Sequence, residues 1–118
     1  MELPAVLCPA HPEFWTQFYA KGGTGERTYE WFMGFEGYWP ALQPLLKAED
    51  RLLHPGCGNS LFSTEVLTAD DCPTGLSIVN CDLCNSVIEL MSEQLQTWSP
   101  SVQERTSFVV QDVCAMTF

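Results

Sequence analysis

Hydrophobic residues along this chain fall into short blocks whose spacing alternates between that of strands and that of helices. The runs at 51–55, 76–81 and 108–110 are short and mostly apolar, which is typical of strands buried in a parallel sheet. Between these runs, apolar residues recur at helical spacing over 62–67 and 87–95. Strands that alternate with helices in this way predict an α/β fold with a parallel sheet.

The N-terminal part of the chain is rich in aromatic residues and forms a segment of its own. We expect residues 1–48 to be an arm and an aromatic-rich helical segment, and residues 49–118 to carry the sheet. Residues 1–12 contain three prolines and no periodicity, so this stretch is predicted to be irregular. Pro12 then begins a predicted short helix, because the aromatic residues that follow fall at i, i+1, i+4 and i+5.

A glycine-rich stretch at 21–26 predicts a loop after this helix. A second group of aromatic residues spans 29–39, and its simplest interpretation is packing in a core or a lid. Leucines spaced after Pro40 predict another helix that reaches residue 46, with Pro44 at a kink or an early turn.

Two glycines one residue apart, Gly56 and Gly58, follow the first predicted strand. Glycine takes positive φ without strain, and it lets a ligand approach the main chain closely. Asn59 and Ser60 then offer side-chain oxygens to the free amides of a helix N-terminus, which is itself electropositive. This arrangement suits a nucleotide-like cofactor. The three-glycine dinucleotide fingerprint would need a further glycine where this chain has Leu61, which disfavours nicotinamide or flavin binding.

Acidic residues follow the second and third predicted strands. Asp82 lies 24 positions beyond Gly58, where a carboxylate can accept both hydroxyls of an adenosine ribose. Asp112 follows the third strand and could accept the exocyclic amine of adenine. The simpler alternative is that the glycines only close a turn, that Asp82 only caps a helix, and that Asp112 only begins a turn. Residues 86–89 have the form of a capping box that starts the next helix, and 96–105 reads as a polar linker.

These motifs together resemble one enzyme family. From Leu53 to Ser60 the chain reads Leu-x-x-Gly-Cys-Gly-Asn-Ser. This motif is followed by an Ile/Val-rich strand that ends in Asp, and then by the sequence Val-Ile-x-x-Met. In this the chain resembles class I S-adenosylmethionine-dependent methyltransferases. More narrowly, it is similar to the methyltransferase-like subgroup whose characterised members modify translation elongation factor one-alpha. Phe14-Trp15, residues 29–32 and residues 111–113 extend the likeness over almost the whole chain.

The resemblance implies a Rossmann-like class I methyltransferase fold and a set of residues that hold S-adenosyl-L-methionine. By analogy with the subgroup, the N-terminal segment folds over the cofactor. The catalytic residues stay unassigned. The cofactor-binding residues implied in this way are Trp15, Trp31, Gly56, Cys57, Gly58, Asn59, Ser60, Asp82, Leu83, Asp112 and Val113.

The length of the chain also bears on the function expected from the resemblance. Three βα units would supply only the 3-2-1 half of the sheet, so we expect an incomplete, N-terminal half of the cofactor-binding domain whose first strand has a bare edge. The activity that the resemblance implies is methylation of a protein lysine or N-terminal amine in an elongation factor. The alternative is a truncated, non-catalytic protein that binds a cofactor or a partner. His54 departs from the acidic residue that many class I enzymes have at this position.

The acidic composition of the chain limits the classes of molecule that it is expected to bind. Fifteen acidic and five basic residues give a net charge of −10, which repels phosphate backbones and suits a basic protein substrate. No run approaches the roughly 18 apolar residues of a membrane span. The first residues lack the features of a secretory signal, so the cytoplasm is the expected location.

Six cysteines occur within helix-like and strand-like patterns, which favours reduced thiols over disulfides. Cys81-x-x-Cys84 precedes a predicted helix, and Cys57 and Cys114 are expected at the same edge of the sheet. Four thiolates there could bind zinc. However, only one close pair is present, and Cys57 belongs to the methyltransferase-like motif. We therefore assign no metal.

Overall fold

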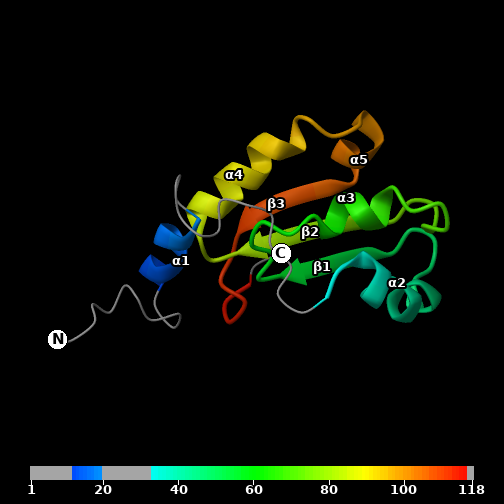
Figure 1. Ribbon diagram of the computed structural model, residues 1–118, viewed down its shortest axis with the longest axis horizontal. Helices are drawn as coiled ribbons and strands as arrows, with labels where there is room; N and C mark the ends of the chain where they lie inside the picture. Colours follow the sequence, from blue (N-terminus) through cyan, green and yellow to red (C-terminus); the bar gives the residue numbers. More distant parts are fainter. Residues whose placement is uncertain (1–11, 20–32, 117–118) are drawn as a thin grey trace.

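A small parallel sheet forms the centre of the molecule (Figure 1). The computed structural model describes residues 12–19 and 33–116. Its strands are β1 (Arg51–Pro55), β2 (Ser77–Asp82) and β3 (Thr106–Val110). Both pairings are parallel, and Leu53, Val79 and Ser107 lie side by side across the sheet. The predicted α/β fold with a parallel sheet is therefore confirmed.

The strands lie in the order β1-β2-β3, so β2 is hydrogen-bonded to both neighbours. The order is 1-2-3 and not 3-2-1 as we expected, a difference only in the edge from which the strands are counted. In the described part of the chain, β1 has a strand neighbour on one side alone. Leu53 on this edge strand is 47% exposed, as expected for a bare apolar edge.

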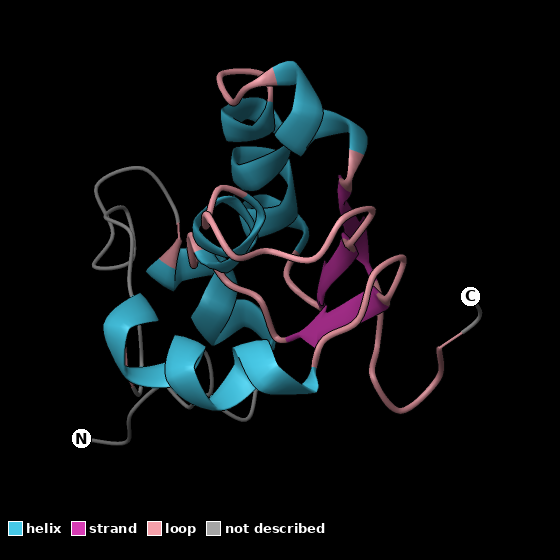
Figure 2. Cartoon of the chain, turned by 90° about the vertical axis from the view of Figure 1, so that its right-hand side faces the viewer, coloured by secondary structure: helices cyan, strands magenta, loops and turns pink. Residues whose placement is uncertain are grey.

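The helices gather on one side of the sheet (Figure 2). Near the N-terminus lie α1 (Pro12–Phe18) and α2 (Phe35–Leu42), and a short 3₁₀ helix, η3 (Gln43–Leu45), continues from α2. The strands are then connected by α3 (Phe62–Leu67), α4 (Asn85–Leu95) and α5 (Pro100–Glu104). No helix within the described ranges is long and apolar enough to cross a membrane.

Two hydrophobic clusters hold these layers together. The larger cluster joins α2, α3 and α5 to the sheet, and its buried members are Trp39, Val66, Leu67, Leu76, Ile78 and Val102. The smaller cluster joins α1 and α4 to the turn after β1, and its buried members are Tyr19, Cys57, Cys84, Val87, Ile88 and Met91. Burial of these side chains is the main driving force for the fold.

The predicted helix at the N-terminus is confirmed, because α1 begins at Pro12. The next helix starts earlier than its prediction, since α2 begins at Phe35 and contains Pro40. Its residues 35, 38, 39 and 42 follow the i, i+3, i+4, i+7 pattern and pack against the larger cluster, and this burial outweighs the proline. Pro44 lies in η3, so the expected early turn is present. The predicted loop at 21–26 lies outside the described residues.

The predicted capping box at 86–89 is wrong. Helix α4 begins at Asn85, and the backbone N–H of its N-cap residue Cys84 donates to Asp82 Oδ1 at 2.9 Å. Glu89 Oε1 instead accepts from Asn85 Nδ2 at 2.9 Å, one turn along the helix. A carboxylate at the end of β2 therefore takes the role that we gave to a residue inside the helix.

The polar linker predicted at 96–105 contains a helix that we did not expect, α5. Pro100 lies in its first turn, where a missing N–H costs nothing. Val102 is 2% exposed and anchors α5 in the larger cluster. A single buried residue in five gave too weak a pattern to reveal the helix from sequence.

Candidate functional site

The turn after β1 has the backbone geometry that the two glycines predicted. Gly56 has φ of 64° and Gly58 has φ of 52°, both in the left-handed region that other residues rarely adopt. The Cys57 N–H between them donates to the Cys81 carbonyl of β2 at 3.0 Å. The turn is therefore fixed to the carboxyl end of the neighbouring strand, the edge at which open α/β sheets bind ligands.

Asp82 connects this turn to the start of α4. Its Oδ2 accepts the Gly58 N–H and its Oδ1 accepts the Cys84 N–H, both at 2.9 Å. The carboxylate therefore orders the glycine turn and the helix N-terminus at the same time. Each carboxylate oxygen has a further acceptor position, so these two bonds leave room for ligand hydroxyls. The simpler prediction, that Asp82 supports a helix start, is confirmed, and its contact with a ribose stays a prediction.

The residues after the turn begin α3. Ser60 Oγ accepts the N–H of Phe62, the first residue of α3, at 3.1 Å, as the capping role predicted. Asn59 is 3% exposed, so its polar side chain is enclosed by the fold.

Tyr19, the residue that follows α1, covers the glycine turn, a contact that sequence reasoning missed. Tyr19 is 7% exposed, and a Cβ built on Gly58 would overlap its hydroxyl oxygen. A Cβ on Gly56 would meet nothing within 4 Å, so this glycine borders open space. The i+4 spacing between Trp15 and Tyr19 was the available signal, because it places both rings on one face of α1.

Trp15 and Trp31, which the resemblance implied as cofactor-binding residues at the wall of the site, differ in what the structure describes. Trp15 packs against the smaller cluster, with its ring centroid 6.2 Å from that of Tyr19. Trp31 lies outside the described residues. The wall contacts of Trp15 and Trp31 stay predictions.

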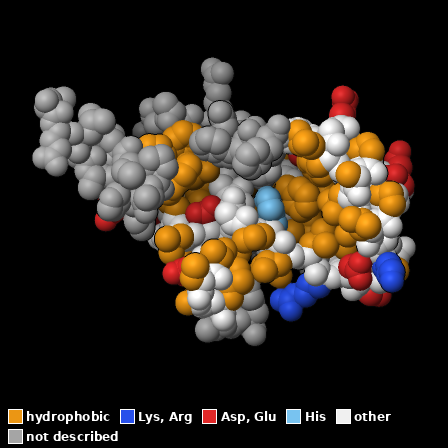
Figure 3. Space-filling model, turned by 90° about the horizontal axis from the view of Figure 1, so that it is seen from below, with side chains coloured by type: hydrophobic (Ala, Val, Ile, Leu, Met, Phe, Trp, Pro, Cys, Tyr) orange, Lys and Arg blue, Asp and Glu red, His pale blue; other side chains and the backbone are white. Residues whose placement is uncertain are grey.

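A pocket of about 740 Å³ opens between α2 and the glycine turn. We call it the glycine-turn pocket. On the turn side it is lined by Tyr19, Gly56, Cys57 and Ser60, and α2 contributes mainly apolar atoms. Figure 3 shows the broad hydrophobic surface on this side of the molecule, with a histidine beside it. Asp82 and Asp112 do not line the pocket: Asp82 is joined to the glycine turn at the Gly58 N–H, and Asp112 follows β3 at the opposite edge of the sheet from β1.

A buried polar network supports the pocket from below. His54 lines the pocket, and its Nδ1 lies 2.8 Å from Asn80 Oδ1. Asn80 is 2% exposed and donates from Nδ2 to Ser63 Oγ at 2.7 Å and to the Ser107 carbonyl at 3.2 Å. Because the amide nitrogen of Asn80 makes these two bonds, its oxygen must accept, and His54 carries its proton on Nδ1. Asn80 thus joins β1, α3 and β3 at the floor of the pocket.

The thiol of Cys57 is not an activated nucleophile. Burial and, to a smaller extent, the charge of Asp82 raise the pKa of Cys57 far above its ordinary value. It therefore stays protonated at neutral pH. Within the described ranges, Cys57, Cys81 and Cys84 are buried free thiols, Cys114 is an exposed one, and no group of three or more acidic, cysteine or histidine side chains could hold a metal.

The end of β3 lies beside Asp82, because the Gln111 N–H donates to the Asp82 carbonyl at 3.1 Å. Asp112 is exposed, and its Oδ1 accepts the Cys114 N–H at 2.8 Å, as in the simpler turn prediction. Leu83 and Val113 follow β2 and β3 and are 52% and 56% exposed. Leu83, Asp112 and Val113, which we predicted to bind the cofactor, therefore lie exposed at the carboxyl edge of the sheet, and their contacts with the cofactor stay predictions.

Comparison with known proteins identifies relatives of this chain, although no protein-family model matches it. The eEF1A lysine and N-terminal methyltransferase of Xenopus laevis is 32% identical over 109 residues, which are 92% of this chain and 14% of that protein. Over most of its length, this chain is therefore similar in sequence to part of an eEF1A methyltransferase. The EEF1A lysine methyltransferase 4 of Bos taurus is 39% identical over 66 residues, which are 55% of this chain and 26% of that protein. The predicted resemblance is thereby confirmed.

The fold is also found in a solved structure. The X-ray structure of YjhP from E. coli superposes with a TM-score of 0.60 at 18% identity, and it covers 89% of this chain and 39% of that protein. This likeness supports the fold alone. The chain spans about 14% of the length of the Xenopus relative, so the relatives' activities are statements about much longer proteins.

Proposed function

We propose that this chain is part of an S-adenosyl-L-methionine-dependent methyltransferase and that its glycine turn binds the cofactor. The observation that supports this most directly is the Asp82 carboxylate, which holds the Gly58 N–H and the start of α4 at the carboxyl edge of a parallel sheet. The relatives from Xenopus laevis and Bos taurus are methyltransferases of eEF1A, which supports the same class of activity for this chain.

The described residues fit such a cofactor. Open space beside Gly56 allows close approach of a ligand to the main chain. The glycine-turn pocket of about 740 Å³ reaches this turn, and the proposed site extends from the turn along the carboxyl edge of the sheet, outside the lining of that pocket. We propose that Asp82 accepts the ribose hydroxyls through its remaining lone pairs. Leu83 and Val113 would contact the faces of the adenine, and Asp112 would accept its exocyclic amine. Cys57, Asn59 and Ser60 would shape the turn, and Trp15 and Trp31 would contribute to the wall.

The cofactor, when bound, supplies a methyl group on a sulfonium that is already activated. The residues of this chain then bind and orient, and no described residue needs to act as a nucleophile. We propose that the acceptor is a lysine or N-terminal amine of a protein, by analogy with the names of the relatives, and specifically of a translation elongation factor. We further propose that this occurs in the cytoplasm, where translation factors work.

Calorimetric titration of the chain with S-adenosylhomocysteine tests the cofactor proposal. We expect micromolar binding that Asp82→Ala weakens at least ten-fold, roughly the loss expected for hydrogen bonds to a charged group. Glu93→Ala is the matched control, because Glu93 is an exposed carboxylate on α4. Gly56→Ala is a second variant, since its added methyl group meets open space in the chain itself but obstructs a ligand. Equal affinity in all four proteins would overturn the proposal.

The acceptor is tested separately by incubating the chain with eEF1A and methyl-labelled cofactor. Label that appears on a lysine or on the N-terminal amine of eEF1A, and that Asp82→Ala reduces, supports the acceptor. Cofactor binding without labelled eEF1A would rule out this acceptor for the chain and leave cofactor binding intact.

The alternative function is non-catalytic binding to another protein through the edge of β1. The exposed Leu53 favours it, because an unpaired apolar strand edge can add a strand from a partner. Sedimentation separates the two functions: a folded monomer that binds S-adenosylhomocysteine counts against pairing through β1, whereas self-association without cofactor binding favours it.

A further inference from the structure

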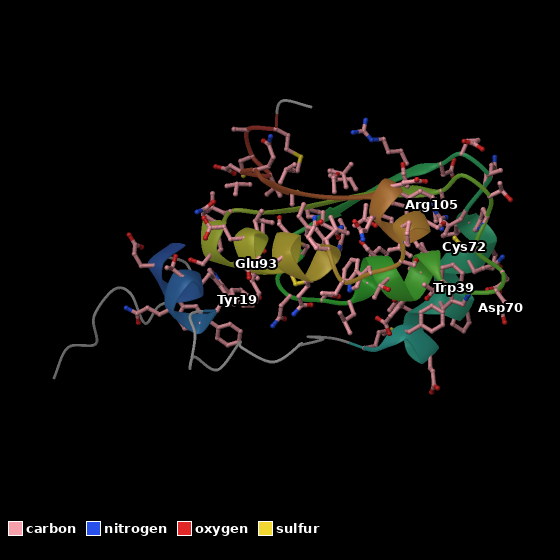
Figure 4. All side chains as sticks on the ribbon, turned by 90° about the horizontal axis from the view of Figure 1, so that it is seen from above. Tyr19, Trp39, Asp70, Cys72, Glu93 and Arg105 are labelled. Carbon is pink, nitrogen blue, oxygen red and sulfur yellow. The ribbon has the colours of Figure 1, made fainter. Side chains whose placement is uncertain are left out.

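A second depression lies at the end of the molecule away from Tyr19 (Figure 4), and Trp39 is one of the residues that line it. It is formed by α2, the end of α3 and the loop after α3, and has a volume of about 720 Å³. Figure 4 shows Trp39 and Asp70 at the end of the fold away from Tyr19, so this depression is distinct from the glycine-turn pocket. We call it the Trp39 groove, and it is lined by Phe35, Trp39, Glu65, Thr68, Ala69, Asp70 and Asp71.

The floor of the Trp39 groove is aromatic and fixed in place. The rings of Phe35 and Trp39 stack with centroids 5.3 Å apart and an interplanar angle of 22°. Trp39 Nε1 donates to Asp71 Oδ1 at 2.8 Å, and Gln43 Nε2 donates to the Asp71 carbonyl at 3.3 Å. These two bonds connect the loop to the helix on the opposite side of the groove, so the carboxylate of Asp71 is held beside the rings before any ligand arrives.

The rim of the groove is negatively charged. Asp70 and Asp71 are exposed, and Glu65 adds a third carboxylate that accepts from Tyr38 Oη at 3.5 Å. Within residues 12–19 and 33–116, no basic side chain forms an ion pair with Asp70 or Asp71. Trp39 is 7% exposed, so the accessible aromatic surface comes mainly from the half-buried Phe35. Apolar surface beside carboxylates complements a side chain with an aliphatic stem and a cationic head.

We propose that the Trp39 groove binds a basic segment of a partner protein, with a lysine or arginine side chain seated in it. The aliphatic stem of such a side chain would pack on Phe35 and Ala69, and its cationic head would lie between Asp70 and Asp71. A second copy of the chain is disfavoured as the occupant, because two molecules of net charge −10 repel one another. The proposal is independent of cofactor binding, since no residue of the groove belongs to the glycine turn.

Fluorescence anisotropy with a short labelled peptide of lysine, arginine and glycine tests this proposal on the whole chain. At low ionic strength we expect saturable binding that Asp70→Asn with Asp71→Asn weakens about ten-fold, through the loss of two charge contacts. Asparagine keeps an oxygen that can accept from Trp39 Nε1. The matched control is Glu93→Gln with Glu104→Gln, which changes the net charge equally at exposed positions outside the groove.

The two double variants distinguish a site from a general charge effect. Peptide binding that the control variant changes less than two-fold, and that Phe35→Leu also weakens, supports the groove. Equal losses in both double variants would show attraction by net charge alone and overturn the proposal. A wild-type chain that binds the lysine-arginine peptide no better than a glutamate counterpart would also overturn it, as would self-association that Asp70→Asn with Asp71→Asn abolishes.

Discussion

At the scale of single residues, the two glycines of the turn have different constraints. Both have positive φ, so both are positions at which a side chain strains the backbone. Only Gly58 is also covered, because Tyr19, which follows α1, lies against the point at which a Cβ would project. Gly56 faces the open pocket. The first constraint follows from local sequence, and the second from packing between segments far apart in the chain.

We therefore expect Gly58→Ala to reduce the free energy of unfolding by about 2–3 kcal/mol, and Gly56→Ala by only about 1 kcal/mol. The difference comes from the overlap with the Tyr19 hydroxyl. Urea unfolding followed by circular dichroism measures both values. Tyr19→Phe in the Gly58→Ala background should recover part of the loss by removing the overlapping oxygen. A larger cost at Gly56 than at Gly58 would contradict this account of the turn.

The sequence was sufficient to predict the glycine turn, but it did not reveal the hydrogen bonds of Asn80 that connect the neighbouring elements. The glycines, Ser60 and Asp82 were recognisable because their roles depend on neighbours in sequence or on a known spacing. Asn80 was not, since a polar residue in a strand gives no sign of which helix or strand it will join. Its bonds to His54 and Ser63 depend on three elements meeting. The ligand contacts of the predicted site residues stay predictions.

At the scale of secondary-structure elements, all three strands were predictable because each is a short apolar run between turn signals. The boundaries of the helices were less predictable, because they depend on tertiary contacts. The Asp82 carboxylate starts α4, and the burial of Val102 stabilises α5. Helix α2 is the clearest case, since its apolar face forms despite an internal proline.

Pro40 should therefore be a weak point of α2. It is exposed, it lies beyond the first turn, and it cannot donate to the carbonyl four residues earlier. Pro40→Ala restores that bond and should raise the free energy of unfolding by about 1–2 kcal/mol, because the helical gain exceeds the added freedom of the unfolded chain. Thermal unfolding by circular dichroism is the measurement. Pro44→Ala in η3 is the comparison and should have a smaller effect, and a loss of stability in Pro40→Ala would show that α2 needs the proline.

At the scale of the whole molecule, charge and packing oppose each other. A net charge of −10 over 118 residues destabilises a compact state, while two hydrophobic clusters on one side of a small sheet stabilise it. The excess of acidic groups was readable from composition. The clustering of acidic side chains beside the rings of the Trp39 groove could not be predicted from composition, because Trp39 and Asp71 come from different parts of the chain that only the fold brings together.

Added salt should accordingly stabilise the chain. Screening of the self-repulsion by about 0.5 M sodium chloride, where the Debye length falls to a few ångströms, is expected to raise the melting temperature by about 3–6 °C. Differential scanning calorimetry across a salt series measures the shift. Glu93→Lys with Glu104→Lys changes the net charge from −10 to −6, since each substitution removes one negative charge and adds one positive charge. This double variant should show a smaller rise in melting temperature with salt. An identical response in both proteins would mean that the salt acts through hydration and not through charge.

The contact of α1 with α4 also has a consequence for how the protein is made. Thr16 Oγ1 of α1 lies 4.0 Å from Cys84 Sγ, its partner 68 positions later in the chain. A ribosome adds about 5–20 residues per second, so the aromatic face of α1 is synthesised roughly 3–14 s before the surface that buries it. During each round of synthesis, this face is exposed to whatever binds nascent chains.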